Sequence, residues 1–223
     1  MKGFAIAIDG PVAAGKGTIA PLLAKKLSGF YLYTGAMYRC LALLAIKKNV
    51  DLSDKTSILG ILPEVKVEFI NDGVFLNGED VTFDIKQQNV ANASSRLAVI
   101  PEVRHHMVKL QQDIAKRAIE EGKIVVAEGR DTATRVFPEA RLKVFLTATA
   151  EERAKRRLEQ LKMMGVVADL ETVLDGVKKR DETDTQRETD PLVKNPQEHG
   201  YFVLDNTNLT EAQTLEAIES QIK

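Results

Sequence analysis

The sequence has one cysteine, no tryptophan and no hydrophobic stretch long enough to span a bilayer. A single cysteine, Cys40, excludes an internal disulfide and fits a reducing compartment. The charges nearly cancel, with 31 Lys and Arg against 32 Asp and Glu, so no overall field attracts nucleic acid or an anionic membrane. We therefore expect a soluble cytoplasmic protein without nucleic-acid or membrane partners, in which local clusters of cations bind any anion.

The chain length of 223 residues predicts a single domain, 1–223, with room for an insertion. Short apolar runs alternate with helical patterns, which include a predicted helix over 35–47. The runs lie at 4–8, 124–127, 142–146 and 201–204. Alternating strands and helices are typical of an α/β fold with a parallel sheet covered on both faces.

The middle of the chain departs from this alternation. Strand-like runs at 65–70, at 74–76 and near Val81 are joined by Asn71-Asp72-Gly73 and by Asn77-Gly78. These are hairpin turn sequences, so we expect a small inserted antiparallel sheet. A helical stretch over 87–121, interrupted at Pro101, leads back to the main sheet.

The C-terminal third is predicted to be mainly helical. Thr149 and Glu152 have capping-box spacing and start an arginine-rich helix, which breaks near Gly165. A second polar helix follows to about residue 186, and a last helix begins near Asn208.

The clearest chemical signal is the stretch FAIAIDGPVAAGKGTIA at residues 4–20. It matches a phosphate-binding P-loop, except that the hydroxyl expected directly after Lys16 arrives one residue late, as Thr18. Backbone N–H groups of such a loop cradle anions at a helix N-terminus, and the lysine reaches the outer phosphates. An ordinary glycine-rich turn is the alternative, but strand, loop, lysine and helix all occur in register. The predicted ATP-binding loop comprises Gly10, Pro11, Val12, Ala13, Ala14, Gly15, Lys16, Gly17 and Thr18.

The displaced hydroxyl resembles a particular subtype of P-loop. Nucleoside monophosphate kinases carry Gly-Lys-Gly-Thr at this place, as GPVAAGKGT does here. Four further segments resemble the bacterial cytidylate kinases in order and spacing over nearly the whole chain. They are YLYTGAMYR at 31–39, NVANASSRLAVIPEVR at 89–104, AEGRDTATRVFPEA at 127–140 and KKRDETDTQRETDPL at 178–192.

This resemblance implies a fold and a reaction. The fold would be a three-layer P-loop kinase fold with an NMP-binding insertion at 64–100 and a helical lid at 150–168. The reaction would transfer a phosphoryl group from ATP, with Mg²⁺, to CMP or dCMP, in a monomer. Thr18 would lie near the metal, which is held largely by water and phosphate oxygens, and no direct protein ligand beyond Thr18 is expected.

The predicted acceptor site centres on Arg130 and Asp131, which follow a predicted strand. Open α/β folds bind ligands at that end of the sheet. By resemblance, Arg130 contacts the acceptor phosphate and Asp131 accepts a hydrogen bond from the cytosine amino group. A carboxylate suits that N4 donor and repels the O4 of uracil. Taken alone, the pair would be read as a local salt bridge.

The resemblance assigns further contacts at residues that spacing alone would leave as solvated or ion-paired helix faces. The acceptor phosphate contacts are Thr34, Tyr38, Arg39 and the clamp Arg187; the base contacts are Ser95 and Arg104; the ribose and phosphate contacts are Arg180 and Asp184; and the lid contacts to ATP are Arg153 and Arg157. No general base is expected, because a phosphate dianion is already nucleophilic. The predicted catalytic set is Lys16, Arg130, Asp131, Arg180 and Arg187.

The sequence also departs from the family pattern. The family usually has Asp where this chain has Tyr33, often Asp at Glu128 and often Gly at Ala133. Two other functions therefore remain open. One is a kinase for UMP or another small molecule. The other is a P-loop binding or switch protein without catalysis, although the guanine-specific run Asn-Lys-x-Asp is absent from the sequence.

Overall fold

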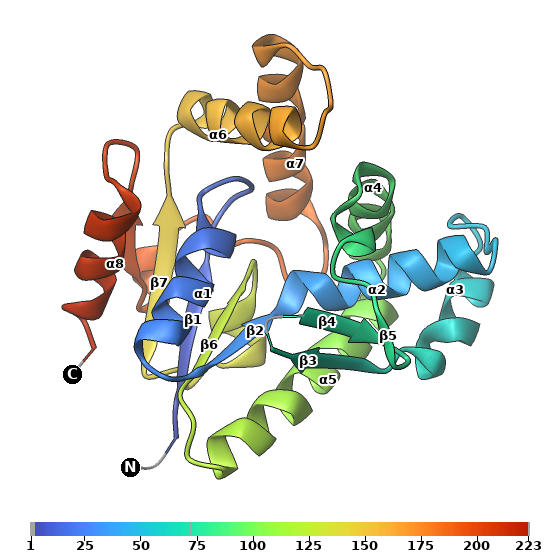
Figure 1. The fold of residues 1–223 in the computed structure, drawn as a ribbon, viewed down its shortest axis with the longest axis horizontal. Helices are drawn as coiled ribbons and strands as arrows, with labels where there is room; N and C mark the ends of the chain where they lie inside the picture. Colours follow the sequence, from blue (N-terminus) through green and yellow to red (C-terminus); the bar gives the residue numbers. More distant parts are fainter. Residues whose placement is uncertain (1–2, 72, 223) are drawn as a thin grey trace. The chain divides into compact units, whose positions relative to one another are not determined.

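The computed structural model describes residues 3–71 and 73–222. The chain divides into two compact units, and each is described by itself. One is formed by the chain up to Tyr31 together with the chain from Ala118 onward, and the other is Leu32–Arg117. Figure 1 labels the elements of both units.

The first unit is built on a five-stranded sheet with the order β2-β6-β1-β7-β8. The strands are β1 (Ala5–Asp9), β2 (Phe30–Tyr33), β6 (Val125–Gly129), β7 (Leu142–Thr147) and β8 (Phe202–Asp205). β1 pairs in parallel with both β6 and β7, and β7 pairs in parallel with β8. This confirms the predicted α/β fold with a central parallel sheet.

The central strand β1 is buried on both faces. Because side chains alternate along a strand, Ile6 and Ile8 face one layer and Ala7 faces the other. The first layer includes Ile19 and Leu23 of α1 (Lys16–Lys26) and residues of α8 (Glu211–Glu219). The second cluster contains Ala7, Ala133, Phe145, Leu192 and Tyr201. Asp9 lies two residues after Ala7 on the same strand, so its carboxylate points into this second cluster.

The remaining helices of the first unit begin at identifiable caps. α6 (Ala150–Met163) has Thr149 as its N-cap, accepting from Glu152 N at 3.3 Å, as predicted. Gly165, with φ of 74°, follows α6, which confirms the predicted break. α7 (Leu170–Gln186) is capped by Asp169. A π-helical turn, η3 (Thr132–Val136), follows β6, and η4 (Pro196–His199) precedes β8.

The predicted start of the last helix near Asn208 is wrong. Leu209 N donates to Asn206 O, so this segment is a turn. Thr210 is the N-cap, because its hydroxyl accepts from Gln213 N and the Gln213 side chain accepts from Thr210 N.

The second unit contains the predicted antiparallel strands. Within it, β3 (Val67–Ile70) pairs with β4 (Gly73–Leu76), and β4 pairs with β5 (Glu79–Asp80). Asn77 and Gly78 both have positive φ, 54° and 83°, as the predicted hairpin turn requires. The other predicted turn includes Asp72, which lies outside the described residues. The last strand ends before Val81, which is fully buried.

Helices make up the rest of the second unit. They are α2 (Thr34–Lys47), α3 (Lys55–Ile61), η1 (Leu62–Glu64), η2 (Asp84–Lys86), α4 (Gln88–Leu97) and α5 (Pro101–Glu120), whose end reaches the first unit. The prediction missed β2 and α3. β2 runs directly into α2 at Thr34 without a turn residue, and α3 has only seven residues behind its cap Asp54. Within residues 3–71 and 73–222, no helix has the length and apolarity needed to cross a membrane.

Gly10 provides a stability prediction. Its φ is 150°, and a Cβ there would overlap the carbonyl oxygen of Leu146. We expect Gly10→Ala to lower the free energy of unfolding by about 1–3 kcal/mol through backbone strain. Gly60→Ala is the matched control, because a Cβ at Gly60 in α3 meets nothing within 4 Å and alanine favours helix. Chemical denaturation of both variants tests this, and equal stability of the two would contradict it.

Candidate nucleotide-binding and phosphoryl-transfer site

The loop between β1 and α1 has the geometry of an anion cradle. Gly15 is the N-cap of α1 with φ of 94°, and no side chain caps the helix. Ala13 also has a positive φ, 58°. Thr18 N and Ile19 N both donate to Gly15 O at 3.0 Å, which turns the chain into the helix. An uncapped helix N-terminus after a glycine-rich loop presents N–H groups and a positive dipole to an anion.

Lys16 is buried beneath this loop. Its Nζ donates to the carbonyl oxygens of Gly10 and Pro11, at 2.7 and 2.8 Å. Burial and the nearby charge of Arg130 lower the pKa of Lys16 to about 7, although Glu128 and Asp9 oppose the shift. Lysine and arginine therefore lie close enough to repel each other, and a bound anion between them would relieve that repulsion.

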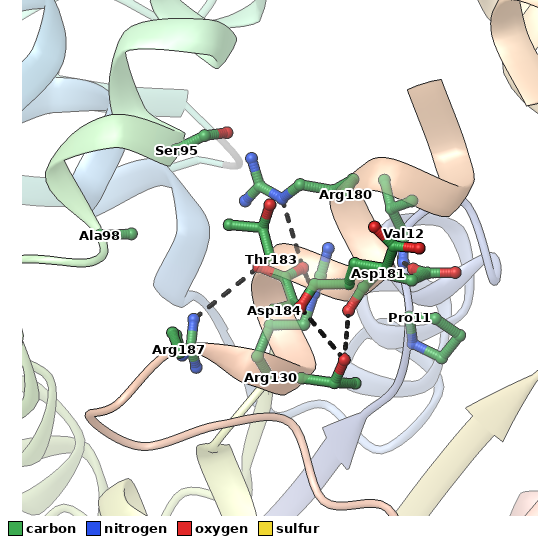
Figure 2. A network of polar contacts seen from close by, with 12 residues as sticks. Pro11, Val12, Ser95, Ala98, Arg130, Arg180, Asp181, Thr183, Asp184 and Arg187 are labelled. Carbon is green, nitrogen blue, oxygen red and sulfur yellow. Dashed lines mark hydrogen bonds and ion pairs between the residues drawn. The ribbon is translucent and has the colours of Figure 1, made fainter. Parts of the chain in front are cut away.

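Three arginines surround the carboxylate of Asp184 (Figure 2). Arg130 Nε lies 2.7 Å from Asp184 Oδ2, and Arg180 Nε lies 3.3 Å from the same oxygen. Arg187 Nη1 lies 3.8 Å from Asp184 Oδ1. Burial alone would raise the pKa of Asp184, but Arg130 and Arg180 lower it to about 2. Asp184 therefore stays ionised and holds the three guanidinium groups together.

Asp131 joins the same group of side chains. Its Oδ1 lies 3.8 Å from Nη2 of Arg187, whose Nε also donates to Asp190 O at 2.7 Å. We define the arginine cluster as Arg130, Asp131, Arg180, Asp184 and Arg187. The structure brings together these five predicted residues from the end of β6 and from α7. The ion pairs within α7 also match the alternative interpretation of this helix face, so the two are not exclusive.

Arg153 of α6 connects the predicted lid to the P-loop. It is buried, and its Nη1 lies 2.6 Å from Asp181 Oδ2 and 3.1 Å from Val12 O. Asp181 in turn accepts from the N–H of Val12 at 3.2 Å. A carboxylate from α7 thus occupies one N–H of the loop that is predicted to bind phosphate, and Figure 2 shows Asp181 beside Val12 and Pro11.

The other predicted lid arginine, Arg157, bonds along its own helix, with Nη1 3.2 Å from Gln160 Oε1. Its neighbour Arg156 instead reaches Asn206, donating to the side-chain oxygen at 3.0 Å and to the backbone oxygen at 2.9 Å. Asn206 donates to Ala14 O at 3.1 Å. Arg156 and Asn206 therefore support the back of the P-loop, a role that sequence reasoning did not assign.

The remaining predicted residues belong to the second unit. Arg104 is 1% exposed, lies 5.6 Å from the centre of the Tyr38 ring and donates to Ala98 O at 3.1 Å. Arg39 Nη1 donates to Ile85 O at 2.7 Å, and Ser95 Oγ to Ala91 O at 3.0 Å. Thr34 is buried at the start of α2. Within this unit, Tyr38 and Arg104 pack together, whereas Arg39 and Ser95 bond to separate carbonyls.

Comparison with known proteins shows the family of the chain. The family model for cytidylate kinase matches residues 6–223. The chain belongs to the cytidylate kinase family. It is 43% identical to the cytidylate kinase of Caldanaerobacter subterraneus over 98% of this chain and 94% of that protein. It is 44% identical to that of Caldicellulosiruptor bescii over 98% and 95%.

A solved structure supports the fold independently of sequence. The crystal structure of TT1252 from Thermus thermophilus is similar over the whole of both chains, with a TM-score of 0.51 at 18% identity. Family membership makes this chain a nucleoside monophosphate kinase, and the predicted roles of individual residues are taken up below as proposals.

Tyr33, Ala133 and Glu128 are the residues at which the resemblance predicts a departure from the family pattern. Tyr33 ends β2, and its ring lies 3.1 Å from where a Cβ on Gly35 would be, so glycine makes room for it. Ala133 is buried in the cluster with Ala7 and Tyr201. Glu128 accepts from the Tyr31 hydroxyl at 3.2 Å. The side chain at each of these three positions is therefore either packed against its neighbours or hydrogen-bonded.

The oxygen donors near Lys16 suit a hard cation such as magnesium. If Gly17 carried a Cβ, that atom would lie 3.8 Å from Glu128 Oε1. The carboxylate of Glu128 therefore lies beside the first turn of α1. The Thr18 hydroxyl belongs to that same turn. Among the residues that the structure describes, no cluster of three or more His, Cys, Asp or Glu side chains could hold a metal ion.

Sequence reasoning missed three polar residues that contact the site. Asp9, Asp181 and Asn206 bond to backbone groups of the P-loop or of the segment after Asp131. Asp9 carried a readable signal, because it is a charged residue at the end of an apolar strand. Asp181 and Asn206 had none, since polar residues on a charged helix or after a strand are common.

Proposed function

We propose that this cytidylate kinase family member transfers the γ-phosphoryl group of ATP to CMP, and to dCMP, giving ADP and CDP or dCDP. The observation that carries the proposal is the arginine cluster, whose arginines surround the carboxylate of Asp184. One of them, Arg130, also acts electrostatically on Lys16 of the P-loop. Two phosphate-bearing substrates that react must be held close together, and both need cations.

The proposed division of roles follows from the positions of these cations. Lys16 exchanges its two loop carbonyls for the outer phosphates of ATP, and the loop N–H groups bind the same triphosphate. Arg130, Arg180 and Arg187 neutralise the acceptor phosphate, which attacks without a general base because it is a dianion. Positioning and charge stabilisation supply most of the rate.

Magnesium enters with ATP in this proposal. When bound, the ion would neutralise negative charge that develops on the phosphates during transfer. Thr18 and Glu128 are the protein oxygens that would hold it or its waters. Arg153 must stay close to the loop it already contacts, and its pairing with Asp181 would be exchanged for contact with phosphate when the lid closes.

The subdomain roles are part of the same proposal. Residues 64–100, which contain β3, β4, β5 and Ser95, would bind the acceptor nucleotide together with Arg104, Thr34, Tyr38 and Arg39. Residues 150–168, which contain α6, would form the lid, with Arg153 and Arg157 directed to ATP. The buried pair of Arg104 and Tyr38 supports this, because a planar cation and a ring fixed together suit contact with a base. We propose a cytoplasmic monomer.

A coupled assay of ADP release tests the reaction and its specificity. We expect turnover with CMP and dCMP, and far less with UMP, AMP or shikimate. Asp131→Asn should lower kcat/KM for CMP by about 10–200-fold and change kcat/KM for UMP little. A carboxylate presents only hydrogen-bond acceptors to the cytosine amino group, whereas an amide also presents a donor. The steady-state rates with each acceptor give these ratios.

The matched control is Asp113→Asn, an exposed change on α5 that should alter neither substrate. Equal losses for CMP and UMP in Asp131→Asn would remove the specificity role. Tight ATP binding by the unmodified protein without transfer to any acceptor would instead favour a catalytically silent nucleotide-binding protein.

A further inference from the structure

Asp9 lies at the junction between the P-loop and the segment that carries Arg130 and Asp131. It is the last residue of β1, directly before Gly10, and its side chain has no solvent exposure. Its register partner on the neighbouring strand β6 is Gly129. One residue therefore borders both the triphosphate loop and the proposed acceptor segment.

The carboxylate of Asp9 accepts three hydrogen bonds. Oδ1 accepts from Thr132 N at 2.8 Å, and Oδ2 accepts from Ala133 N at 2.8 Å. Oδ2 also accepts from the Tyr201 hydroxyl at 2.7 Å. The two amides belong to the first residues of the π-helical turn η3, directly after Asp131. Such turns often mark functional sites, and here the carboxylate supplies the acceptors that fix where the turn begins.

A buried carboxylate is a costly choice for a purely structural contact. Burial raises the pKa of Asp9, the charge of Asp131 raises it further, and the bonds from Ala133, Tyr201 and Thr132 oppose the rise. Lys16 is the cation that Asp9 acts on electrostatically. A neutral amide could not accept from both Thr132 N and Ala133 N, because one of its two atoms is a donor. An ionised carboxylate accepts all three hydrogen bonds at once.

We infer that Asp9 is a positioning residue for phosphoryl transfer, which uses its carboxylate to hold the Arg130–Asp131 segment at a fixed distance from the P-loop, with Tyr201 as its buried support. The inference rests on the proposed transfer to CMP. Asp9 touches neither substrate. It acts by setting where the cation and the carboxylate that read the acceptor lie relative to Lys16.

The structure explains why this position matters for rate. A displacement of about 1 Å between reacting groups can cost about 100-fold in rate. The chain between Gly129 and Thr132 is short, so a shift of the η3 turn moves Arg130 and Asp131 with it. In the proposed function, ATP is bound by the loop that follows Gly10, so its binding should not depend on η3.

The test compares Asp9→Asn and Tyr201→Phe with the unmodified protein. We expect Asp9→Asn to raise KM for CMP and lower kcat, each by about tenfold or more. The dissociation constant for ATP, measured by titration calorimetry at a pH well below the pKa of Lys16, should change less than about twofold, because Lys16 keeps its charge there without Asp9. Tyr201→Phe keeps the edge contact of the ring with Phe145 and removes one donor. As the pH is lowered, kcat of Tyr201→Phe should begin to fall at a higher pH than kcat of the unmodified protein. The reason is that the pKa of Asp9 rises further without the hydrogen bond from Tyr201.

Asp54→Asn is the matched control, since Asp54 also accepts a backbone N–H, from Thr56 at 3.0 Å, on an exposed helix cap. It should leave both kinetic constants unchanged. Equal weakening of ATP and CMP binding in Asp9→Asn, or an unmoved acid limb in Tyr201→Phe, would overturn the positioning role. Failure of the proposed function is distinguishable, because the unmodified protein would then fail to phosphorylate CMP.

Discussion

Lys16→Met is expected to lower kcat by about 100- to 1,000-fold, the loss that follows removal of one preorganised charge from a transition state. Lys16 is buried, and its Nζ is held by the carbonyl oxygens of Gly10 and Pro11. Methionine keeps much of the length and the apolar stem, so the loop should keep its shape. The steady-state rate with saturating ATP and CMP measures the loss.

The pH dependence separates a charge effect from a packing effect. The pKa of Lys16 is lowered to about 7 in the free protein, chiefly by burial and then by Arg130. Bound phosphates favour the charged lysine, so ATP binding should raise this pKa and take up a proton above pH 7. ATP affinity of the unmodified protein should therefore fall as the pH rises from 7 to 9, and that of Lys16→Met should not.

Calorimetry in buffers of different ionisation enthalpy counts the proton directly. The matched control is Lys25→Met, because Lys25 lies on the same helix and is exposed. It should keep both kcat and the proton uptake. An unchanged proton count in Lys16→Met would show that another group titrates.

The parts of the site that the sequence predicted are those with local spacing. Gly10, Gly15 and Lys16 mark the loop because a strand, a tight turn and a helix each require particular residues at short range. Arg180 and Asp184 of α7 and its C-cap Arg187 lie close together because residues three and four apart are neighbours on a helix, whereas their predicted roles came from the family resemblance.

The parts that the sequence did not predict depend on partners far along the chain. Asp9 and Tyr201 are 192 residues apart, and Val12 and Asp181 are 169 apart. No periodicity links such pairs, because they meet only when the parallel sheet brings strand ends together. β2 was missed for a different reason, since its four residues pass into α2 without a turn.

The role of Arg130 can be separated from that of its partner Asp184 by two variants. Arg130→Met removes the cation nearest the buried carboxylate and leaves Asp184 with Arg180 and Arg187. Breaking a buried ion pair on one side typically costs about 3–5 kcal/mol of stability. The loss here should be smaller, because Arg180 and Arg187 still compensate part of the charge of Asp184. The same change removes a proposed contact to the acceptor phosphate, so kcat/KM for CMP should fall by at least about 30-fold.

The double variant Arg130→Met with Asp184→Asn removes both charges. It should regain part of the lost free energy of unfolding, since the carboxylate that lost its nearest partner is no longer charged, while Arg180 and Arg187 lose their shared partner. Its kcat/KM for CMP should stay as low as that of the single variant, because an acceptor phosphate still lacks its cation. Arg117→Met, an exposed change on α5, is the control for loss of one positive charge. Denaturation curves and initial rates for the set decide between the two roles: activity that returns together with stability would mean that Arg130 acts only by pairing with Asp184.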